Sequence, residues 1–174
     1  EAGQDVQLSI DSRVQFLAYS ALSRQVEATK AIAGAVLVAD ATTGEIIALA
    51  NVPTYDPNDR STVLFERMRN RVLTDMFEPG STMKPFAIAK GLDMGIVDPL
   101  TTIQTAPGKL TIGDRTIGDT HNYGLLTVAQ VVAKSSNIGT AKIALEIPPA
   151  TLYDTYSELG FGRAPNIGFP GASS

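Results

Sequence analysis

The order of hydrophobic and polar positions predicts a long helix followed by two strands. Between residues 11 and 29, apolar side chains recur at spacings of three and four, as on the buried stripe of an amphipathic helix; they are Val14, Leu17, Ala18, Ala21 and Leu22. Ser12 with Gln15 forms a capping-box pattern at the start of this helix. Two apolar runs, Ala35–Ala39 and Glu45–Ala50, flank a polar loop that ends in glycine, which predicts a hairpin. Both strands carry apolar residues on both faces, so both faces should be covered.

The rest of the chain is expected to be mostly helical. We predict a short helix over residues 62–68, a small hairpin over 109–117, and helices over 126–134, 138–145 and 151–159. The side chains expected to face inward from the first of these last three helices are Val128, Val131 and Val132. A sheet of two strands is marginal on its own. The predicted fold class is therefore α/β (α+β), with a helical subdomain and an incomplete antiparallel sheet in one domain spanning residues 1–174.

Composition narrows the classes of function. The chain has 174 residues, 44% hydrophobic and 18% charged, which favours a globular domain. Its net charge of −4 and the lack of a basic run argue against nucleic acid as a partner. There is no cysteine, so thiol catalysis and cysteine metal sites are excluded, and neither a metal nor another cofactor is expected. The single histidine, His121, has no neighbours that suggest a Ser-His-Asp triad, so a structural role in a loop is expected for it.

The segment Ser81-Thr82-Met83-Lys84 is the strongest chemical signal. It follows Glu78-Pro79-Gly80 and precedes Pro85, a residue tolerated only in the first turn of a helix, so the helix should begin at about Ser81. Residues three apart share a helix face, so the amine of Lys84 could take the proton of the Ser81 hydroxyl. The helix dipole should help Lys84 to lose its own proton.

This tetrad is weak evidence alone, since eleven serines and six lysines make one accidental match about an even chance. The plain alternative is a capped helix start with a solvated lysine. A second element, Ser135-Ser136-Asn137, lies where one predicted helix ends and the next begins. Together, S-x-x-K and S-x-N are two of the three active-site motifs of the serine enzymes that recognise penicillin.

With these motifs in view, the chain resembles a class B penicillin-binding protein, a peptidoglycan D,D-transpeptidase. The segments that carry the resemblance are Ala50–Asn58, Arg69–Pro85 and Lys134–Gly139, and the likeness extends from about Asp5 to Gly171. It is most similar to the septal, cell-division type of Gram-negative bacteria. The resemblance implies the fold shared by penicillin-binding proteins and serine β-lactamases.

The sequence departs from the family in one respect. The third motif, K-T-G or K-S-G, is absent, because none of the six lysines is followed by Thr-Gly or Ser-Gly. We therefore expect residues 1–174 to be the N-terminal portion of a transpeptidase domain, without its C-terminal half and without the membrane anchor. Alone, such a chain should be only marginally stable and nearly inactive, and it should pair with another polypeptide, either the missing half as a separate chain or a second copy of itself.

The resemblance also implies roles for individual residues. Ser81 would attack the carbonyl of the penultimate D-alanine of a stem peptide, Lys84 would be its base, and Ser135 would pass a proton to the leaving amine. Asn137 would bind the substrate amide and hold Lys84, while Thr120 and Tyr123 would line the rim of the pocket. The plain alternatives are a helix cap for Ser135, a turn amide for Asn137 and an ordinary polar loop for the last two.

The implied partners and location follow from the same family. They are peptidoglycan stem peptides, β-lactam antibiotics and other cell-division proteins, at the periplasmic face of the bacterial inner membrane. Two other functions remain open at this stage. A class D β-lactamase also carries S-T-x-K but has Val or Ile at the position of Asn137, and a non-catalytic β-lactam sensor or binding fragment would need no third motif.

Overall fold

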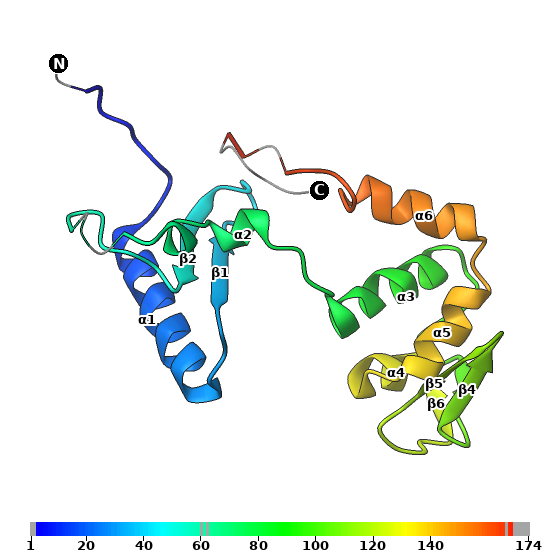
Figure 1. Cartoon of the computed structure of the whole chain (residues 1–174). Helices are drawn as coiled ribbons and strands as arrows, with labels where there is room; N and C mark the ends of the chain where they lie inside the picture. Colours follow the sequence, from blue (N-terminus) through cyan, green and yellow to red (C-terminus); the bar gives the residue numbers. More distant parts are fainter. Residues whose placement is uncertain (1–2, 60, 62, 166, 169–174) are drawn as a thin grey trace. The chain divides into compact units, whose positions relative to one another are not determined.

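The computed structural model describes residues 3–59, 61, 63–165, 167 and 168. The chain divides into two compact units, one formed mainly by the residues up to Met76 and the other by Phe77–Pro165. The helices are α1 (Ser12–Thr29), α2 (Arg71–Thr74), α3 (Lys84–Asp93), α4 (Val128–Lys134), α5 (Asn137–Leu145) and α6 (Pro149–Glu158), with 3-10 turns η2 (Phe65–Arg67) and η3 (Gly80–Met83) (Figure 1). The strands are β1 (Gly34–Ala39), β2 (Ile46–Val52), β3 (Thr102–Gln104), β4 (Lys109–Ile112), β5 (Arg115–Gly118) and β6 (Leu125–Thr127).

Helix α1 begins one residue earlier than the capping-box pattern suggested. Asp11, not Ser12, is the N-cap, and its carboxylate accepts hydrogen bonds from the backbone N–H groups of Arg13 and Val14 at 2.8 and 3.1 Å. These bonds lower the pKa of the Asp11 carboxyl, the bond from Val14 most. A short carboxylate at the N-cap accepts from the free N–H groups of the first turn, which explains the choice of cap.

The first unit contains the antiparallel pair β1–β2, with Leu37 opposite Leu49. One face of this pair lies under α1, where Ala48 and Ala50 are almost fully buried. Gly34 belongs to this packing, because a Cβ there would lie 2.8 Å from Val26 on α1. On the other face Leu37 remains 44% exposed, so that face is covered only in part. The predicted helix over an incomplete sheet is confirmed.

The outer edge of β2 is occupied by the segment that leads into α1. The side-chain amide of Gln15 donates to the carbonyl of Leu49 and accepts from its N–H, both at 2.8 Å. Next to it, the N–H of Asp11 donates to Ile47 O at 3.0 Å and the Ser9 hydroxyl donates to Ile46 O at 2.6 Å. Gln15, which the sequence suggested as part of a cap, therefore pairs with this strand as another strand would.

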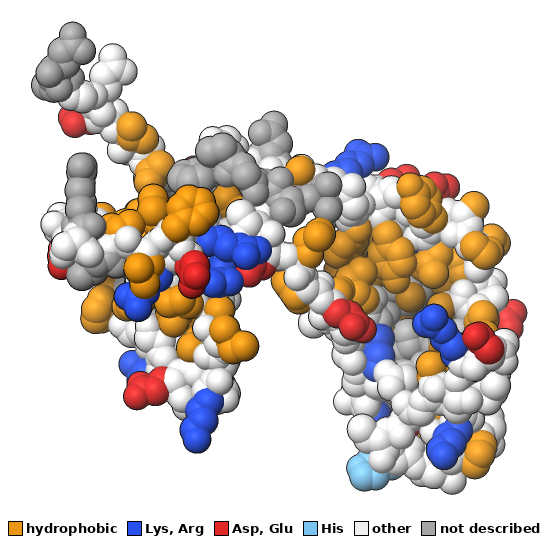
Figure 2. Space-filling view, viewed as in Figure 1, with side chains coloured by type: hydrophobic (Ala, Val, Ile, Leu, Met, Phe, Trp, Pro, Cys, Tyr) orange, Lys and Arg blue, Asp and Glu red, His pale blue; other side chains and the backbone are white. Residues whose placement is uncertain are grey.

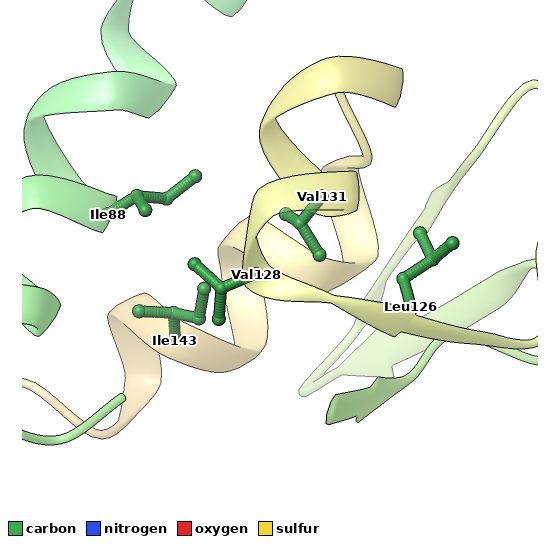
Figure 3. Close-up of a cluster of buried hydrophobic side chains, with 5 residues drawn as sticks. All are labelled: Ile88, Leu126, Val128, Val131 and Ile143. Atoms are coloured by element: carbon green, nitrogen blue, oxygen red, sulfur yellow. The ribbon is translucent and has the colours of Figure 1, made fainter. Parts of the chain in front are cut away.

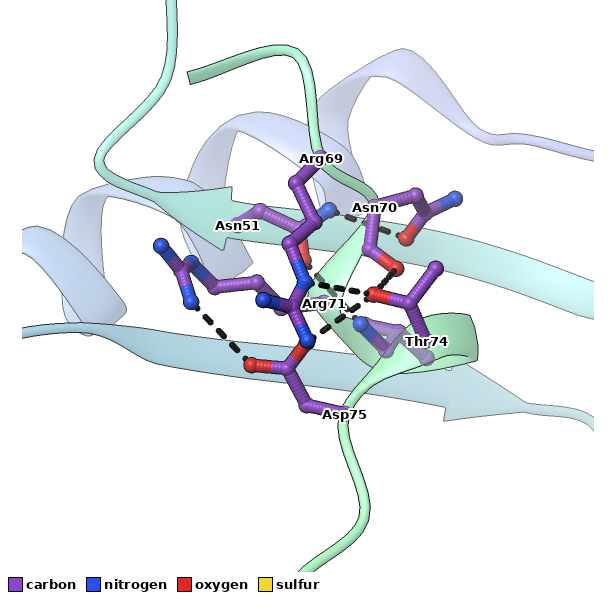
Figure 4. Close-up of polar contacts among 7 residues, drawn as sticks. Asn51, Arg69, Asn70, Arg71, Thr74 and Asp75 are labelled. Carbon is purple, nitrogen blue, oxygen red and sulfur yellow. Dashed lines mark hydrogen bonds and ion pairs between the residues drawn. The ribbon is translucent and has the colours of Figure 1, made fainter. Parts of the chain in front are cut away.

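Helix α2 joins the sheet through a polar cluster on the less covered face (Figure 4). The Asn51 amide donates to Asn70 Oδ1 at 3.1 Å and accepts from the N–H of Val72 at 3.2 Å. Beside it, the Asp75 carboxylate pairs with Arg69 at 2.7 Å and Arg71 at 3.1 Å. Residues 62–68 were predicted to be a short helix. The structure has only a 3-10 turn, Phe65–Arg67, in this stretch, and Thr62 lies outside the described residues.

The second unit is built around one apolar cluster. Ile88 of α3, Leu126 of β6, Val128 and Val131 of α4, and Ile143 of α5 are each at most 3% exposed (Figure 3). The predicted hairpin is β4–β5, and β3 pairs with β6, a strand pair that the sequence did not predict. The predicted helix over 126–134 begins only at Val128, because Leu126 belongs to β6. Val132, expected to face inward, is 48% exposed.

Hydrophobic side chains also reach the surface of each unit (Figure 2). On α1, Phe16 and Leu17 are 68% and 65% exposed, although Leu17 belongs to the predicted buried stripe. Within the part of the chain that the structure describes, no helix combines the length and the apolar character that crossing a bilayer requires.

Candidate active site

Ser81 lies in the 3-10 turn that leads into α3. This turn spans Gly80–Met83, and the α-helix starts at Lys84, three residues later than predicted. Gly80 enters the turn at φ 57°, a left-handed conformation that suits glycine. The Ser81 side chain is exposed, and no hydrogen bond of its hydroxyl is found among the described residues. The hydroxyl is therefore accessible to a ligand.

Lys84 connects this turn with the Ser135 motif, 51 residues further along the chain. Its Nζ donates to the carbonyl oxygen of Ser135 at 2.5 Å and lies 3.0 Å from Ser135 Oγ. Ile88, one helical turn after Lys84, is buried in the apolar cluster with Val131, which is one turn before Ser135. The core thus holds the two helix ends at a separation that lets the amine reach the serine.

The pKa of the Lys84 amine is lowered from its ordinary value. Partial burial of the ammonium is the main cause, and the negative charge of Asp119 opposes it. The direction of this pKa shift is the one expected from the sequence, and burial of the ammonium contributes most to it. A lowered pKa increases the fraction of neutral amine that can accept a proton.

Ser135 sits at a sharp turn between α4 and α5. It is the C-cap of α4 with φ 52° and ψ 42°, and its N–H bonds to the last carbonyls of that helix. Among the described residues, only Lys30 and Ser135 adopt a positive φ without being glycine. This conformation points both the carbonyl and the hydroxyl of Ser135 towards Lys84. It costs some backbone strain, because a serine rarely adopts a positive φ.

Gly139 allows this turn to pack closely. A Cβ on Gly139 would lie 2.5 Å from Val131 Cγ2, closer than real side chains approach. One turn further along α5, a Cβ on Gly91 of α3 would lie 2.7 Å from Ile143 Cγ2. Two glycines therefore let α5 approach both α4 and α3.

Asn137 does not bond to Lys84 in the part of the chain that the structure describes. Its side-chain amide donates to the carbonyl of Gly118 at 2.7 Å, at the end of β5. A carbonyl can only accept, so the amide nitrogen faces Gly118 and the amide oxygen remains available as an acceptor. Asn137 is exposed, so its oxygen is accessible.

Asp119 is the polar group of this region that the sequence did not single out. Its carboxylate accepts from Ser136 Oγ at 2.6 Å and from the N–H groups of Asn137 and Ile138 at 2.5 and 3.1 Å. The only available signal in the sequence was an acidic residue two positions after the predicted hairpin. That signal is weak, because acidic residues are common in loops.

Thr120 and Tyr123 bond to each other rather than to the motif residues. Thr120 Oγ1 and Tyr123 OH lie 2.9 Å apart, and the Tyr123 ring packs partly against the apolar cluster. Lys134, the residue before Ser135, places its Nζ 5.1 Å from the centre of that ring. The rings of His121 and Tyr123 also pack against each other in a T-shaped arrangement. The two predicted rim residues thus lie beside the Ser135 turn.

The structure therefore brings together Lys84 and Ser135, with Asn137 on the same turn and an accessible serine three residues before Lys84. A lysine amine of lowered pKa that contacts one serine and follows another by three residues supplies the residue types needed to transfer acyl groups through a serine. Lys84 of the first motif and Ser135 of the second are thus in contact in one candidate site.

Comparison with known proteins identifies the family. The model of the penicillin binding protein transpeptidase domain matches residues 34–174. A probable peptidoglycan D,D-transpeptidase, PenA of Neisseria flavescens, is 52% identical over 99% of this chain, and the peptidoglycan D,D-transpeptidase FtsI of Escherichia coli K12 is 42% identical over all of it. The apo transpeptidase domain of penicillin-binding protein 3 from Burkholderia pseudomallei is 42% identical over 99% of this chain and 48% of that one, with a TM-score of 0.85.

The chain belongs to the penicillin-binding protein transpeptidase family. It spans 42% of the length of the Neisseria relative and 29% of the length of the Escherichia coli relative, so it corresponds to part of those proteins. The mixed arrangement of helices and partial antiparallel sheets matches the fold expected from the resemblance.

Proposed function

We propose that the protein containing this chain is a peptidoglycan D,D-transpeptidase that cross-links stem peptides during septal cell-wall synthesis. The observation that carries the proposal is the contact between the Lys84 amine and Ser135. Lys84 itself lies three residues after the accessible Ser81. The two curated relatives described above are named as D,D-transpeptidases, which supports the reaction type. The septal role rests on the resemblance of the motifs to cell-division enzymes.

The proposed first step is acylation of Ser81. Its Oγ attacks the carbonyl carbon of the penultimate D-alanine while Lys84 Nζ takes the hydroxyl proton. The proton then passes through Ser135 Oγ to the nitrogen of the terminal D-alanine, and the C–N bond breaks. This route is supported by the distance of 3.0 Å between Lys84 Nζ and Ser135 Oγ and by the lowered pKa of Lys84.

In the second step an amine of a neighbouring stem attacks the ester, and Ser81 Oγ leaves and regains a proton. Asn137 would accept a hydrogen bond from a substrate amide with its side-chain oxygen, and Thr120 and Tyr123 would form part of the rim. A β-lactam would acylate the same serine. The K-T-G motif, which these 174 residues do not contain, is proposed to lie in another part of the protein.

The proposed location is the periplasmic face of the inner membrane, where stem peptides are found. Other cell-division proteins are the proposed partners. Both proposals rest on the family resemblance, and a division-specific role would be tested by depletion of the protein: cells should elongate without dividing if it acts at the septum.

Labelling of the full-length protein with a fluorescent penicillin tests the mechanism. Ser81→Ala should abolish the adduct, and mass analysis of the wild type should locate it on Ser81. Lys84→Ala should slow acylation by about 10²- to 10⁴-fold, the usual contribution of a general base. Ser12→Ala and Lys90→Ala are matched controls, since Ser12 is exposed on α1 and Lys90 pairs with Asp93 on the surface of α3. Normal acylation of Lys84→Ala would exclude Lys84 as the base.

The fate of the adduct separates the three functions considered. A transpeptidase holds the penicillin adduct for a long time and transfers the acyl group of a peptide donor to an added amine. A β-lactamase releases the adduct rapidly to water. A sensor holds the adduct but does not form a cross-linked product from a peptide donor and an amine.

A further inference from the structure

We infer that Asp119 is a positioning residue of the acylation site: its carboxylate holds the turn from Ser135 to Asn137 in place and presents the negative charge that faces Lys84. The inference rests on the proposed function for its catalytic meaning. It concerns a residue outside both motifs, which reaches the site from the end of the β4–β5 hairpin.

The first observation is the number of bonds to one carboxylate. Oδ1 accepts from the N–H groups of Asn137 and Ile138, and Oδ2 accepts from Ser136 Oγ. Hydrogen bonds to an ionised acceptor are about twice as strong as neutral ones. Three of them fix the first residues of α5, and with them the turn that carries Ser135.

The second observation is the burial of Ser136. Its side chain is 1% exposed, and its hydroxyl both donates to Asp119 and accepts from the N–H of Gly139 at 2.9 Å. Because the Ser136 hydroxyl is buried, a water molecule cannot take the place of the Asp119 carboxylate as its acceptor unless Ser136 moves. The middle serine of the motif is a connector between the carboxylate and the first turn of α5.

The third observation concerns charge near Lys84. The elements that pack around its amine carry Asp119 after β5, Lys134 on α4 and Lys142 on α5. Lys134 lies over the Tyr123 ring, and Lys142 donates to the Gln104 carbonyl at 2.7 Å. Asp119 is the charged group whose field acts on Lys84, and it favours the protonated amine against the effect of burial. Asp119 thus limits how far the pKa of Lys84 falls.

The same segment orients Asn137. The carbonyl of Gly118, the residue before Asp119, accepts from the Asn137 side-chain amide. Gly118 and Asp119 therefore fix both the backbone and the side chain of Asn137, and leave its side-chain oxygen available to accept a hydrogen bond. A substrate that offers an N–H group fits this arrangement.

Asp119→Asn in the full-length protein tests the contribution of the Asp119 charge while the shape of the side chain is nearly unchanged. The amide has nearly the same size and keeps one acceptor oxygen, but it removes the charge. We expect the limiting rate of penicillin acylation to fall about tenfold or more, as a displaced turn can cost up to about 100-fold. Because the anion no longer stabilises the Lys84 ammonium, the acid limb of the pH–rate profile should move to lower pH.

Three further variants complete the comparison. Ser136→Ala removes one of the three hydrogen bonds to Asp119 but keeps the carboxylate. The acylation rate should therefore fall, while the acid limb of the pH–rate profile stays in place. Asp114 is exposed at the turn of the same hairpin, so Asp114→Asn should change neither the acylation rate nor the acid limb of the pH–rate profile. Asp119→Glu keeps the charge with a longer side chain. If Asp119→Asn does not fold, the expected result for Asp119→Glu is a reduced rate with the limb in place.

Titration of Lys84 by NMR provides a readout that does not depend on acylation. The Lys84 signal should titrate at lower pH in Asp119→Asn than in the wild type. An unchanged Lys84 titration, or an acylation rate within twofold of the wild type, in folded Asp119→Asn overturns the inference. A wild-type protein that forms no adduct at Ser81 contradicts the proposed function instead, while the NMR comparison still decides whether Asp119 acts on Lys84.

Discussion

At the scale of single residues, the amine of Lys84 combines a lowered pKa with direct contact to a second serine. If the neutral amine is the base, acylation should increase with pH as Lys84 loses its proton. Since the pKa is lowered, this acid limb should lie below the value of about 10.4 of a free lysine. The measurement is the second-order rate of penicillin acylation as a function of pH.

The control for this pH profile is Lys84→Arg. A guanidinium does not lose its proton in this range, so its rate should remain low at every pH without an acid limb. A wild-type limb near the pKa of a free lysine, or a profile shared by Lys84→Arg, would contradict the assignment.

Ser135 offers a second residue-scale prediction, because it holds a left-handed conformation that glycine adopts more easily. Ser135→Gly should leave stability unchanged or raise it by up to about 1 kcal/mol, while acylation falls by at least about 100-fold through loss of the proton route. Lys30→Gly is the matched control, since Lys30 ends α1 at φ 54°. It should affect stability similarly and leave acylation intact. Denaturant unfolding and penicillin labelling measure the two effects.

The sequence predicted these residues unevenly. Ser81, Lys84 and Ser135 were predicted by short motifs whose spacing has a chemical reason, and the structure places Lys84 against Ser135. Asp119 could not be predicted, because its three partners lie 17 to 19 residues away and depend on how the β4–β5 hairpin folds back on α5. The catalytic roles of Ser81, Lys84 and Ser135 stay predictions, which the variants described above test.

At the scale of elements, the close approach of α4 and α5 depends on Gly139. Gly139→Ala should destabilise the protein by about 1–3 kcal/mol, because the added Cβ meets Val131 in a filled core. The double variant Gly139→Ala with Val131→Ala should recover part of this loss, since the shorter side chain makes room for the new methyl group. Denaturant unfolding of the four proteins gives the coupling energy. Additive effects of the two substitutions would contradict the clash.

The sequence predicted most helices and strands of the chain but not their ends. Helix α1, the β1–β2 hairpin and helices α5 and α6 follow their periodicity to within a few residues. The pair β3–β6 was missed because each strand has only three residues and its partner lies more than 20 positions away. Leu126 and Val128 are both apolar, so hydrophobicity alone could not show that the strand ends and the helix begins between them.

At the scale of the whole molecule, the sheet of the first unit has one face that is only partly covered. Because a two-stranded sheet is marginal, the 174-residue chain alone should be weakly stable and should label with penicillin far more slowly than the full-length protein. Adding the remaining part of the domain as a separate polypeptide should restore labelling. Size-exclusion chromatography and labelling of both samples test this. A stable monomer that acylates at the rate of the full-length protein would contradict it.

The Gln15 amide on the edge of β2 determines the direction in which the sheet can grow. Both backbone groups of Leu49 are already paired with Gln15, so an incoming strand finds no free ladder on that side. Leu37 lies opposite Leu49, and in an antiparallel pair its backbone groups then point away from β2. Any further strand must therefore add beside Ala35 and Leu37. One glutamine makes the sheet asymmetric: the edge at Leu49 is closed to unwanted association, and the edge beside Leu37 is left to accept an additional strand.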